Sequence, residues 1–209
     1  MLNSGINVII EGVNMQRLLL GLAVTVRIAF ISIILGSLLG ILLGLIRTSK
    51  SKVITFICRV YLEVFRIIPI LVWLFIVYFG VTNLLNIHLD GEIVALIIFS
   101  LWGAAEMSDI VRGALESLPK HQMESGLALG LSFWELYRYI LIPQAVRRML
   151  PGAINLSTRM VKTTSLVVMI GVIDVVKVGQ QIIERSFTLL FVIRCPSGQK
   201  NWKLNGRIK

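Results

Sequence analysis

The chain has 209 residues, of which 56% are hydrophobic, 15% charged and 8% aromatic. Its mean hydropathy is +0.84, and a soluble domain of this size has too little interior to hide so much apolar surface. Two cysteines are too few for a disulfide framework. The composition argues against a soluble enzyme, a disordered chain and a disulfide-rich scaffold. It predicts an all-α, polytopic bundle of transmembrane helices.

The net charge of +10 is concentrated next to apolar segments. Such basic loops are typical of cytoplasmic anchors at a lipid surface, so membrane lipid is an expected partner. No basic face with interleaved aromatic residues is present, and we expect no nucleic-acid partner. Half of the net charge lies in residues 194–209, in Arg194, Lys200, Lys203, Arg207 and Lys209.

Apolar runs predict four membrane spans, near residues 18–46, 60–81, 93–115 and 152–173. The first includes residues 28–46, which carry no charge and are long enough to cross about 30 Å of hydrocarbon. Gly36, Gly40 and Gly44 form a stripe of small residues against which a second helix can pack closely. Alternatively, these glycines are scattered on a lipid-facing helix. The fourth span is the weakest, because it contains Arg159 and Lys162.

The loop charges predict the topology. Residues 47–60 and 106–151 are rich in Lys and Arg, whereas residues 80–92 contain neither. By the positive-inside rule the two basic loops are cytoplasmic, and residues 82–91 lie outside together with an external N-terminal segment, residues 1–17.

This topology requires a fifth crossing, for which the chain offers little. Only residues 187–193 are continuously apolar there, and seven helical residues cover about 10.5 Å. We therefore expect a transmembrane domain at residues 18–184, followed by an atypical basic tail at residues 185–209. A coding frameshift or a truncation is the interpretation that we favour for this defective fifth span.

The cytoplasmic loop at residues 118–150 is too polar to span a membrane and too patterned to be a linker. Pro119 suits a first helical turn, Gly130 suits a helix end with positive φ, and Ser132 with Glu135 forms a capping box. Pro143 is expected to break or kink the chain. We expect two short helices that meet at Gly130 and form a knob, which either packs under the bundle or docks on a cytoplasmic partner. The apolar side of this knob consists of Leu127, Leu131, Phe133 and Trp134.

The segment Glu124-Ser125-Gly126-Leu127-Ala128-Leu129-Gly130 resembles the EAA loop in the membrane subunits of ATP-binding-cassette importers. More narrowly, residues 18–184 resemble permeases for polar amino acids of the histidine and glutamine type. Five further segments support this resemblance in the expected order: Glu63-Val64-Phe65-Arg66-Ile67-Ile68-Pro69-Ile70-Leu71, Ala104-Ala105-Glu106, Arg112-Gly113-Ala114-Leu115-Glu116-Ser117-Leu118-Pro119, Ile142-Pro143-Gln144-Ala145 and Lys162-Thr163-Thr164-Ser165-Leu166.

The resemblance implies a type I importer permease in the bacterial cytoplasmic membrane. Such a subunit forms a path for a polar amino acid similar to glutamine, histidine or arginine. It implies three partners: a cytoplasmic ATPase that supplies the energy, a second permease subunit, identical or different, and an extracytoplasmic amino-acid-binding protein. The residues that the resemblance assigns to ATPase coupling are Glu124, Ser125, Gly126, Ala128 and Gly130.

The sequence departs from the family at four places. The defective fifth helix is the largest departure, and His121 stands where the family commonly has glycine. Ser125 and Gly126 stand where the family commonly has two alanines, which preserves small side chains. Thr163 stands where the family often has an acidic residue, which affects the expected substrate preference.

Six residues are candidates for the substrate path: Lys162, Thr163, Thr164, Ser165, Arg66 and Glu106. Each has a structural alternative. Arg66 can pair with Glu63 on one helix face, Lys162 can snorkel together with Arg159, and the hydroxyls can bond to their own helix backbone. Glu106 and Asp109 resemble a catalytic dyad, but Arg112 on the same face is expected to neutralise them.

Other classes of function fit less well. An intramembrane enzyme would need a nucleophile with a base, a metal cluster or paired carboxylates, and the two histidines, His88 and His121, fall on opposite sides of the membrane. The chain contains no phosphate-binding loop. We expect no enzymatic activity, no cofactor and no metal. A non-transporting membrane scaffold, or an inactive remnant of a permease, is the alternative function.

Overall fold

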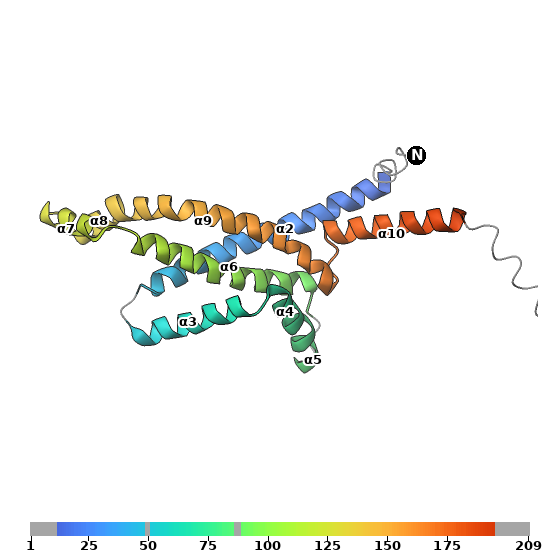
Figure 1. Ribbon diagram of the computed structural model, residues 1–209, viewed down its shortest axis with the longest axis horizontal. Helices are drawn as coiled ribbons and strands as arrows, with labels where there is room; N and C mark the ends of the chain where they lie inside the picture. The colour runs from blue at the N-terminus through green and yellow to red at the C-terminus, as the bar shows by residue number, and fades with distance from the viewer. Residues whose placement is uncertain (1–11, 49–50, 86–88, 195–209) are drawn as a thin grey trace, which may run out of the picture. The chain divides into compact units, whose positions relative to one another are not determined.

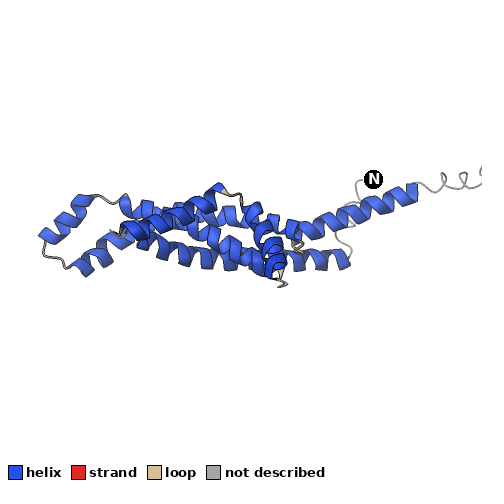
Figure 2. Ribbon diagram, turned by 90° about the horizontal axis from the view of Figure 1, so that it is seen from below, coloured by secondary structure: helices blue, strands red, loops and turns tan. Residues whose placement is uncertain are grey.

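The computed structural model describes residues 12–48, 51–85 and 89–194, and these contain helices and turns but no strand (Figure 2). The prediction of an all-α chain is therefore confirmed for the described residues. The expectations for residues 1–11 and for the basic tail from residue 195 onward lie outside them. The chain divides into two compact units, residues 1–24 with 173–209, and residues 25–172. Helix α2 (Gly12–Ile46) contributes to both units.

Within the larger unit, α6 (Gly91–Glu116) is the central helix (Figure 1). It packs against α9 (Ile142–Thr163), α3 (Lys52–Ile67) and α4 (Ile70–Phe75). Its first turn is capped by Asp90, whose side chain accepts a hydrogen bond of 3.0 Å from the amide of Glu92. Small and large apolar residues alternate along its buried faces, and this pattern lets neighbouring helices approach from several directions.

The glycine stripe of α2 lies against α6. A Cβ on Gly36 would lie 3.2 Å from the carbonyl oxygen of Ser100, and one on Gly40 would lie 2.9 Å from that of Ala104. At Gly44 the carbonyl oxygen of Ser108 would be 3.0 Å away. The two backbones are thus in direct contact at three successive turns, which only residues without a side chain permit.

The second predicted span is broken. After α3 the chain turns by 98° into the helical segment Ile70–Leu84, which comprises α4, the π-helix η1 (Ile76–Val81) and the start of α5 (Thr82–Leu85). Ile68 is extended, with φ −83° and ψ 121°, because the ring of Pro69 excludes the helical conformation before it. The predicted span over residues 60–81 is therefore not one straight helix but a pair of helices bent at Ile68 and Pro69. The 16 residues of α3 measure about 24 Å, less than the hydrocarbon layer.

The second short helix of the predicted knob is not separate from the fourth span. Helix α8 (Phe133–Leu136), the π-helix η2 (Tyr137–Leu141), α9 and the 3₁₀-helix η3 (Thr164–Ile170) follow one another without interruption. Pro143 lies in the first turn of α9. The amide of the preceding residue, Ile142, donates to the carbonyl of Tyr137, five residues back, which is the spacing of a π-helix. This wider turn accommodates the proline, so of the two predicted alternatives, a break or a kink, the break at Pro143 is wrong.

Two helices among the described residues, α2 and α6, are long and apolar enough to cross a membrane. The number rises to as many as four if each of two bent pairs counts as one span: Lys52–Ile67 with Ile70–Leu84, and Phe133–Ile170 with Val175–Arg185. The third predicted span, near residues 93–115, coincides with α6.

The smaller unit pairs the beginning of α2 with α10 (Val175–Arg194). Asp174 is fully buried, and its Oδ1 accepts a hydrogen bond of 2.8 Å from the amide of Lys177, which caps α10. Arg17 donates to Oε1 of Gln181 at 2.5 Å. Among the described residues, α10 counts toward a membrane span only as Val175–Arg185, together with Phe133–Ile170 in a bent pair.

Replacing Gly40 with leucine should prevent stable packing of α2 on α6. The new side chain would meet the backbone of Ala104 as well as Met107, and a backbone cannot move aside. We expect a cost of at least about 3 kcal/mol, seen as loss of the folded protein on size-exclusion chromatography. The matched control is Gly113→Leu in α6, where a Cβ would meet nothing within 4 Å. Equal yields of the two variants would contradict the prediction.

Candidate functional site

The first candidate site is the α7–α8 knob, residues 119–136. Helix α7 (Lys120–Ala128) begins after Pro119 and ends in a Schellman motif. The amide of Leu131 donates to the carbonyl of Gly126 at 3.2 Å, and that of Gly130 donates to Leu127 at 3.0 Å. Gly130 has a φ of 81°, which confirms the positive φ expected at this position.

The predicted capping box starts α8. The amide of Ser132 donates to the Glu135 carboxylate at 2.9 Å, and the amide of Glu135 donates to Oγ of Ser132 at 3.4 Å. The Ser132 hydroxyl also donates to this carboxylate, at 2.6 Å. These hydrogen bonds lower the pKa of Glu135. The carboxylate is therefore ionised at neutral pH, and the turn between α7 and α8 is held by reciprocal contacts.

The apolar side chains of the knob are mostly on its surface. Only Leu136 is fully buried, and it packs directly on Gly126, where a Cβ would collide with it. Trp134 is 81% exposed and Leu129 is 82% exposed. The bundle therefore does not cover these side chains in this structure. Met123, Leu127 and Phe133 are also exposed, as are Glu124, Ser125 and Ala128.

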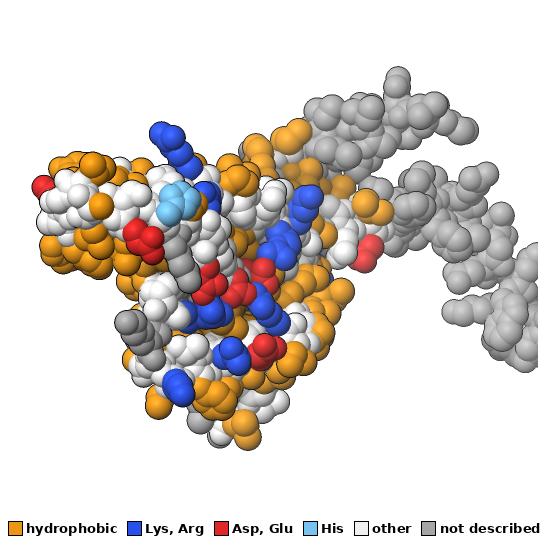
Figure 3. Space-filling view, turned by 60° about the vertical axis from the view of Figure 1, so that its left-hand side comes forward, with side chains coloured by type: hydrophobic (Ala, Val, Ile, Leu, Met, Phe, Trp, Pro, Cys, Tyr) orange, Lys and Arg blue, Asp and Glu red, His pale blue; other side chains and the backbone are white. Residues whose placement is uncertain are grey.

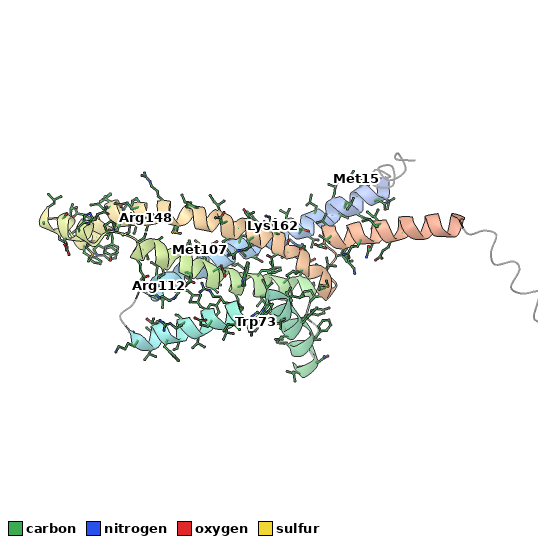
Figure 4. The ribbon with its side chains drawn as sticks, in the orientation of Figure 1. Met15, Trp73, Met107, Arg112, Arg148 and Lys162 are labelled. Carbon is green, nitrogen blue, oxygen red and sulfur yellow. The ribbon has the colours of Figure 1, made fainter. Side chains whose placement is uncertain are left out.

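The second candidate site, the α6–α9 charged cluster, consists of Trp102, Glu106, Arg159 and Lys162. Arg159 donates to Glu106 at 2.5 Å, and its guanidinium lies 5.4 Å from the centre of the Trp102 ring. Lys162 is exposed one helical turn further along α9 (Figure 4). Acidic and basic side chains gather on one face of the molecule (Figure 3).

The three hydroxyls after Lys162 bond to their own helix. Thr163 donates to the carbonyl of Arg159 at 2.8 Å, Thr164 to Val161 at 2.7 Å and Ser165 to Lys162 at 2.9 Å. This is the structural alternative that the sequence left open. Each oxygen still has lone pairs with which it can accept a further hydrogen bond.

A third group, the Asp109 clamp, consists of Arg47, Arg66 and Asp109. Both arginines form ion pairs with the Asp109 carboxylate, and Arg47 also donates to the hydroxyl of Ser108 at 3.1 Å. The clamp joins the ends of α2 and α3 to the second half of α6. Sequence reasoning missed it, because no local pattern relates residues on three different helices.

Two predicted ion pairs are therefore wrong. Arg66 pairs with Asp109 rather than with Glu63, since the packing of α3 on α6 offers it a carboxylate from across the interface. Arg112 does not neutralise Glu106 or Asp109; it pairs with Glu116 one turn further on, at 2.6 Å.

The family described as the binding-protein-dependent transport system inner membrane component matches residues 32–193. The chain belongs to this family. It is therefore the permease component of an ATP-binding-cassette transporter and a multi-pass protein of the bacterial inner membrane, and ATP hydrolysis belongs to a separate subunit.

The permease is similar along most of its length to curated relatives. It is 36% identical over 167 residues to the probable amino-acid ABC transporter permease YckA of Bacillus subtilis, covering 80% of this chain and 74% of the relative. It is 35% identical to the arginine transport system permease ArtQ of the same organism, with 77% and 74% covered. Identity to the glutamine transport system permease GlnP of Escherichia coli is 36%, with 81% and 78% covered.

Two solved structures share the permease fold. The crystal structure of an amino acid ABC transporter with histidines matches 86% of this chain and 90% of its own, with a TM-score of 0.72 at 23% identity. The inward-facing MetNI methionine transporter matches 88% and 94%, with a TM-score of 0.64 at 18% identity. The arrangement of helices is thus that of importer permeases.

Proposed function

We propose that this permease forms the translocation path for a polar amino acid of the glutamine, arginine and histidine type. The relatives that transport arginine and glutamine support this substrate class. The observation that carries the proposal is the α6–α9 charged cluster, which places ionisable groups inside a segment that belongs to a membrane domain.

Lys162 is the decisive residue of this cluster. It is exposed, and no acidic side chain in the described part of the chain lies within ion-pair distance of it. A lysine facing lipid near the middle of a membrane costs about 2.5–3.5 kcal/mol, so such residues generally face a water-filled cavity or a partner. We therefore place Lys162 on the path, where its ammonium group can attract the carboxylate of an amino acid.

The neighbouring groups suit the opposite end of a zwitterion. Glu106 is partly accessible and paired with Arg159, so an incoming ammonium group can share its carboxylate. The hydroxyl oxygens of Thr163, Thr164 and Ser165 can accept hydrogen bonds but carry no charge, so they would hold an amine more weakly than a carboxylate would. Arg66 is already paired with Asp109, and we assign it a different role below.

The α7–α8 knob is proposed to dock on the ATPase, with Glu124, Ser125, Gly126, Ala128 and Gly130 in or beside the contact. Its exposed aromatic and aliphatic side chains fit a groove in a protein partner. In this arrangement residues 118–150 are cytoplasmic and residues 82–91 are external. A second permease subunit completes the path, and an external binding protein delivers the amino acid.

Lys162→Met tests the path. In the complete importer in proteoliposomes, we expect the apparent KM for glutamine import to rise at least about tenfold, because the variant loses a charge-assisted contact of about 1.5–3 kcal/mol. The matched control is Arg147→Met, which removes an exposed charge from the same helix. Equal import by the two variants would remove Lys162 from the path. If the unaltered chain binds the ATPase but the complex imports no amino acid, the scaffold alternative is favoured.

A further inference from the structure

The Asp109 clamp joins three helices through one carboxylate. Arg47 follows the end of α2, Arg66 is the penultimate residue of α3, and Asp109 lies in the second half of α6. Two guanidinium groups share a single negative charge, so the clamp carries a net positive charge while both arginines are paired with Asp109. We call these two ion pairs the arms of the clamp.

The two arms of the clamp differ in burial. The side chain of Arg47 is 9% exposed, whereas that of Arg66 is 44% exposed. If Arg66 leaves, water can hydrate it and the remaining Arg47–Asp109 pair is electrically balanced. If Arg47 leaves, a nearly buried cation is left without its partner, which is costly. The Arg66–Asp109 ion pair is therefore the one that can separate at the lower cost.

Arg66 lies directly before the sharpest bend of the larger unit. Its neighbour Phe65 stacks on Trp73 of α4, with ring centroids 4.7 Å apart and planes inclined by 13°. This stack joins the end of α3 to the start of α4, across the extended residue Ile68 and Pro69. The end of α3 and the beginning of α4 therefore form one corner, which Arg66 fastens to α6.

The corner also contacts the proposed path. Helix α4 packs against η3, which begins at Thr164, immediately after Lys162 and Thr163. A continuous series of contacts thus runs from Asp109 through Arg66, the Phe65–Trp73 stack and α4 to η3. Coupling between distant sites needs such a contiguous element with two alternative positions.

We propose that the Arg66–Asp109 ion pair is a latch of the transport cycle. When closed, as in this structure, it holds the α3–α4 corner on α6 and thereby keeps α4 against η3. When Arg66 is released, the corner can move away from η3 while the Arg47–Asp109 pair continues to join α2 to α6. Arg66 is then a positioning residue for transport, and this role rests on the proposed path along α9 and η3.

Arg66→Gln in the complete importer, reconstituted in proteoliposomes with its ATPase and a glutamine-binding protein, tests the latch. Glutamine keeps a polar side chain and removes the charge. We expect ATP hydrolysis in the absence of amino acid to rise at least about fivefold, because a coupling free energy between the two sites is lost. The number of glutamine molecules imported per ATP should fall by a similar factor.

Three variants complete the test. Arg59→Gln removes an exposed arginine from α3, the helix that also carries Arg66, and should leave both quantities unchanged. Arg66→Lys keeps the charge and should restore most of the coupling. Trp73→Leu keeps the ion pair but breaks the stack, so it should uncouple the importer even if Arg66→Gln does not assemble.

The outcomes separate the latch from the proposed path. The latch would be overturned if Trp73→Leu were as tightly coupled as Arg59→Gln, and if Arg66→Gln, where it assembles, were as well. Basal ATP hydrolysis is measured without amino acid, so it tests the latch independently of the substrate. A failure of the unaltered importer to transport glutamine, arginine or histidine would instead contradict the proposed function.

Discussion

Gly130→Val should reduce amino-acid import at least about tenfold, while the protein still inserts into the membrane. Gly130 has a φ of 81° and closes the Schellman motif that ends α7. A β-branched residue in this region of φ costs well over 1 kcal/mol, and each 1.4 kcal/mol changes an equilibrium tenfold. The end of α7 would unwind or turn in another direction, and the exposed surface that we propose to dock on the ATPase would lose its shape.

Two companion variants isolate the backbone as the cause. Gly113→Val introduces the same side chain into α6, where a Cβ would meet nothing within 4 Å and φ is helical, so import should be close to normal. Gly130→Asn should retain most of the import, because asparagine tolerates positive φ. Import is measured with labelled glutamine, and insertion by the amount of assembled complex. Normal import by Gly130→Val would show that this turn is not needed.

Asp109→Asn should destabilise the folded permease by about 3–5 kcal/mol, because it leaves the nearly buried guanidinium of Arg47 without a counter-charge. Asparagine has almost the same shape as aspartate, so the loss is electrostatic rather than steric. For a chain of this length the expected decrease in Tm is about 10 °C or more. The measurement is thermal unfolding of the purified complex in detergent, followed by tryptophan fluorescence.

Glu116→Gln is the matched control for this prediction. It also replaces a carboxylate of α6 by an amide, but the Arg112–Glu116 pair is exposed, with 31% and 58% of the two side chains accessible. Exposed pairs within one helix contribute less than about 1 kcal/mol. An equal decrease in Tm for the two variants would mean that Asp109 has no special place in the fold.

Local features of this fold could be predicted because their causes lie within a few residues. The positive φ at Gly130 and the capping box of Ser132 and Glu135 depend on contacts within one turn. The two prolines show the limit of such reasoning. Pro69 breaks its helix, whereas Pro143 is accommodated by the π-helical turn before it. Both have the same covalent restriction, and the difference lies in the hydrogen bonds that the surrounding helix can rearrange.

The sequence by itself determined the helical class, the family and the residues available for the two candidate sites. Hydropathy, helix caps and the order of motifs can all be read along the chain, without knowledge of which helices pack together. The tertiary structure decided which partner each charge takes. Arg66 had a glutamate one turn away, yet it pairs with Asp109 of α6. Long side chains reach any helix packed beside their own, and ion pairs form wherever packing brings a carboxylate into a partly shielded interface, so sequence distance does not specify them.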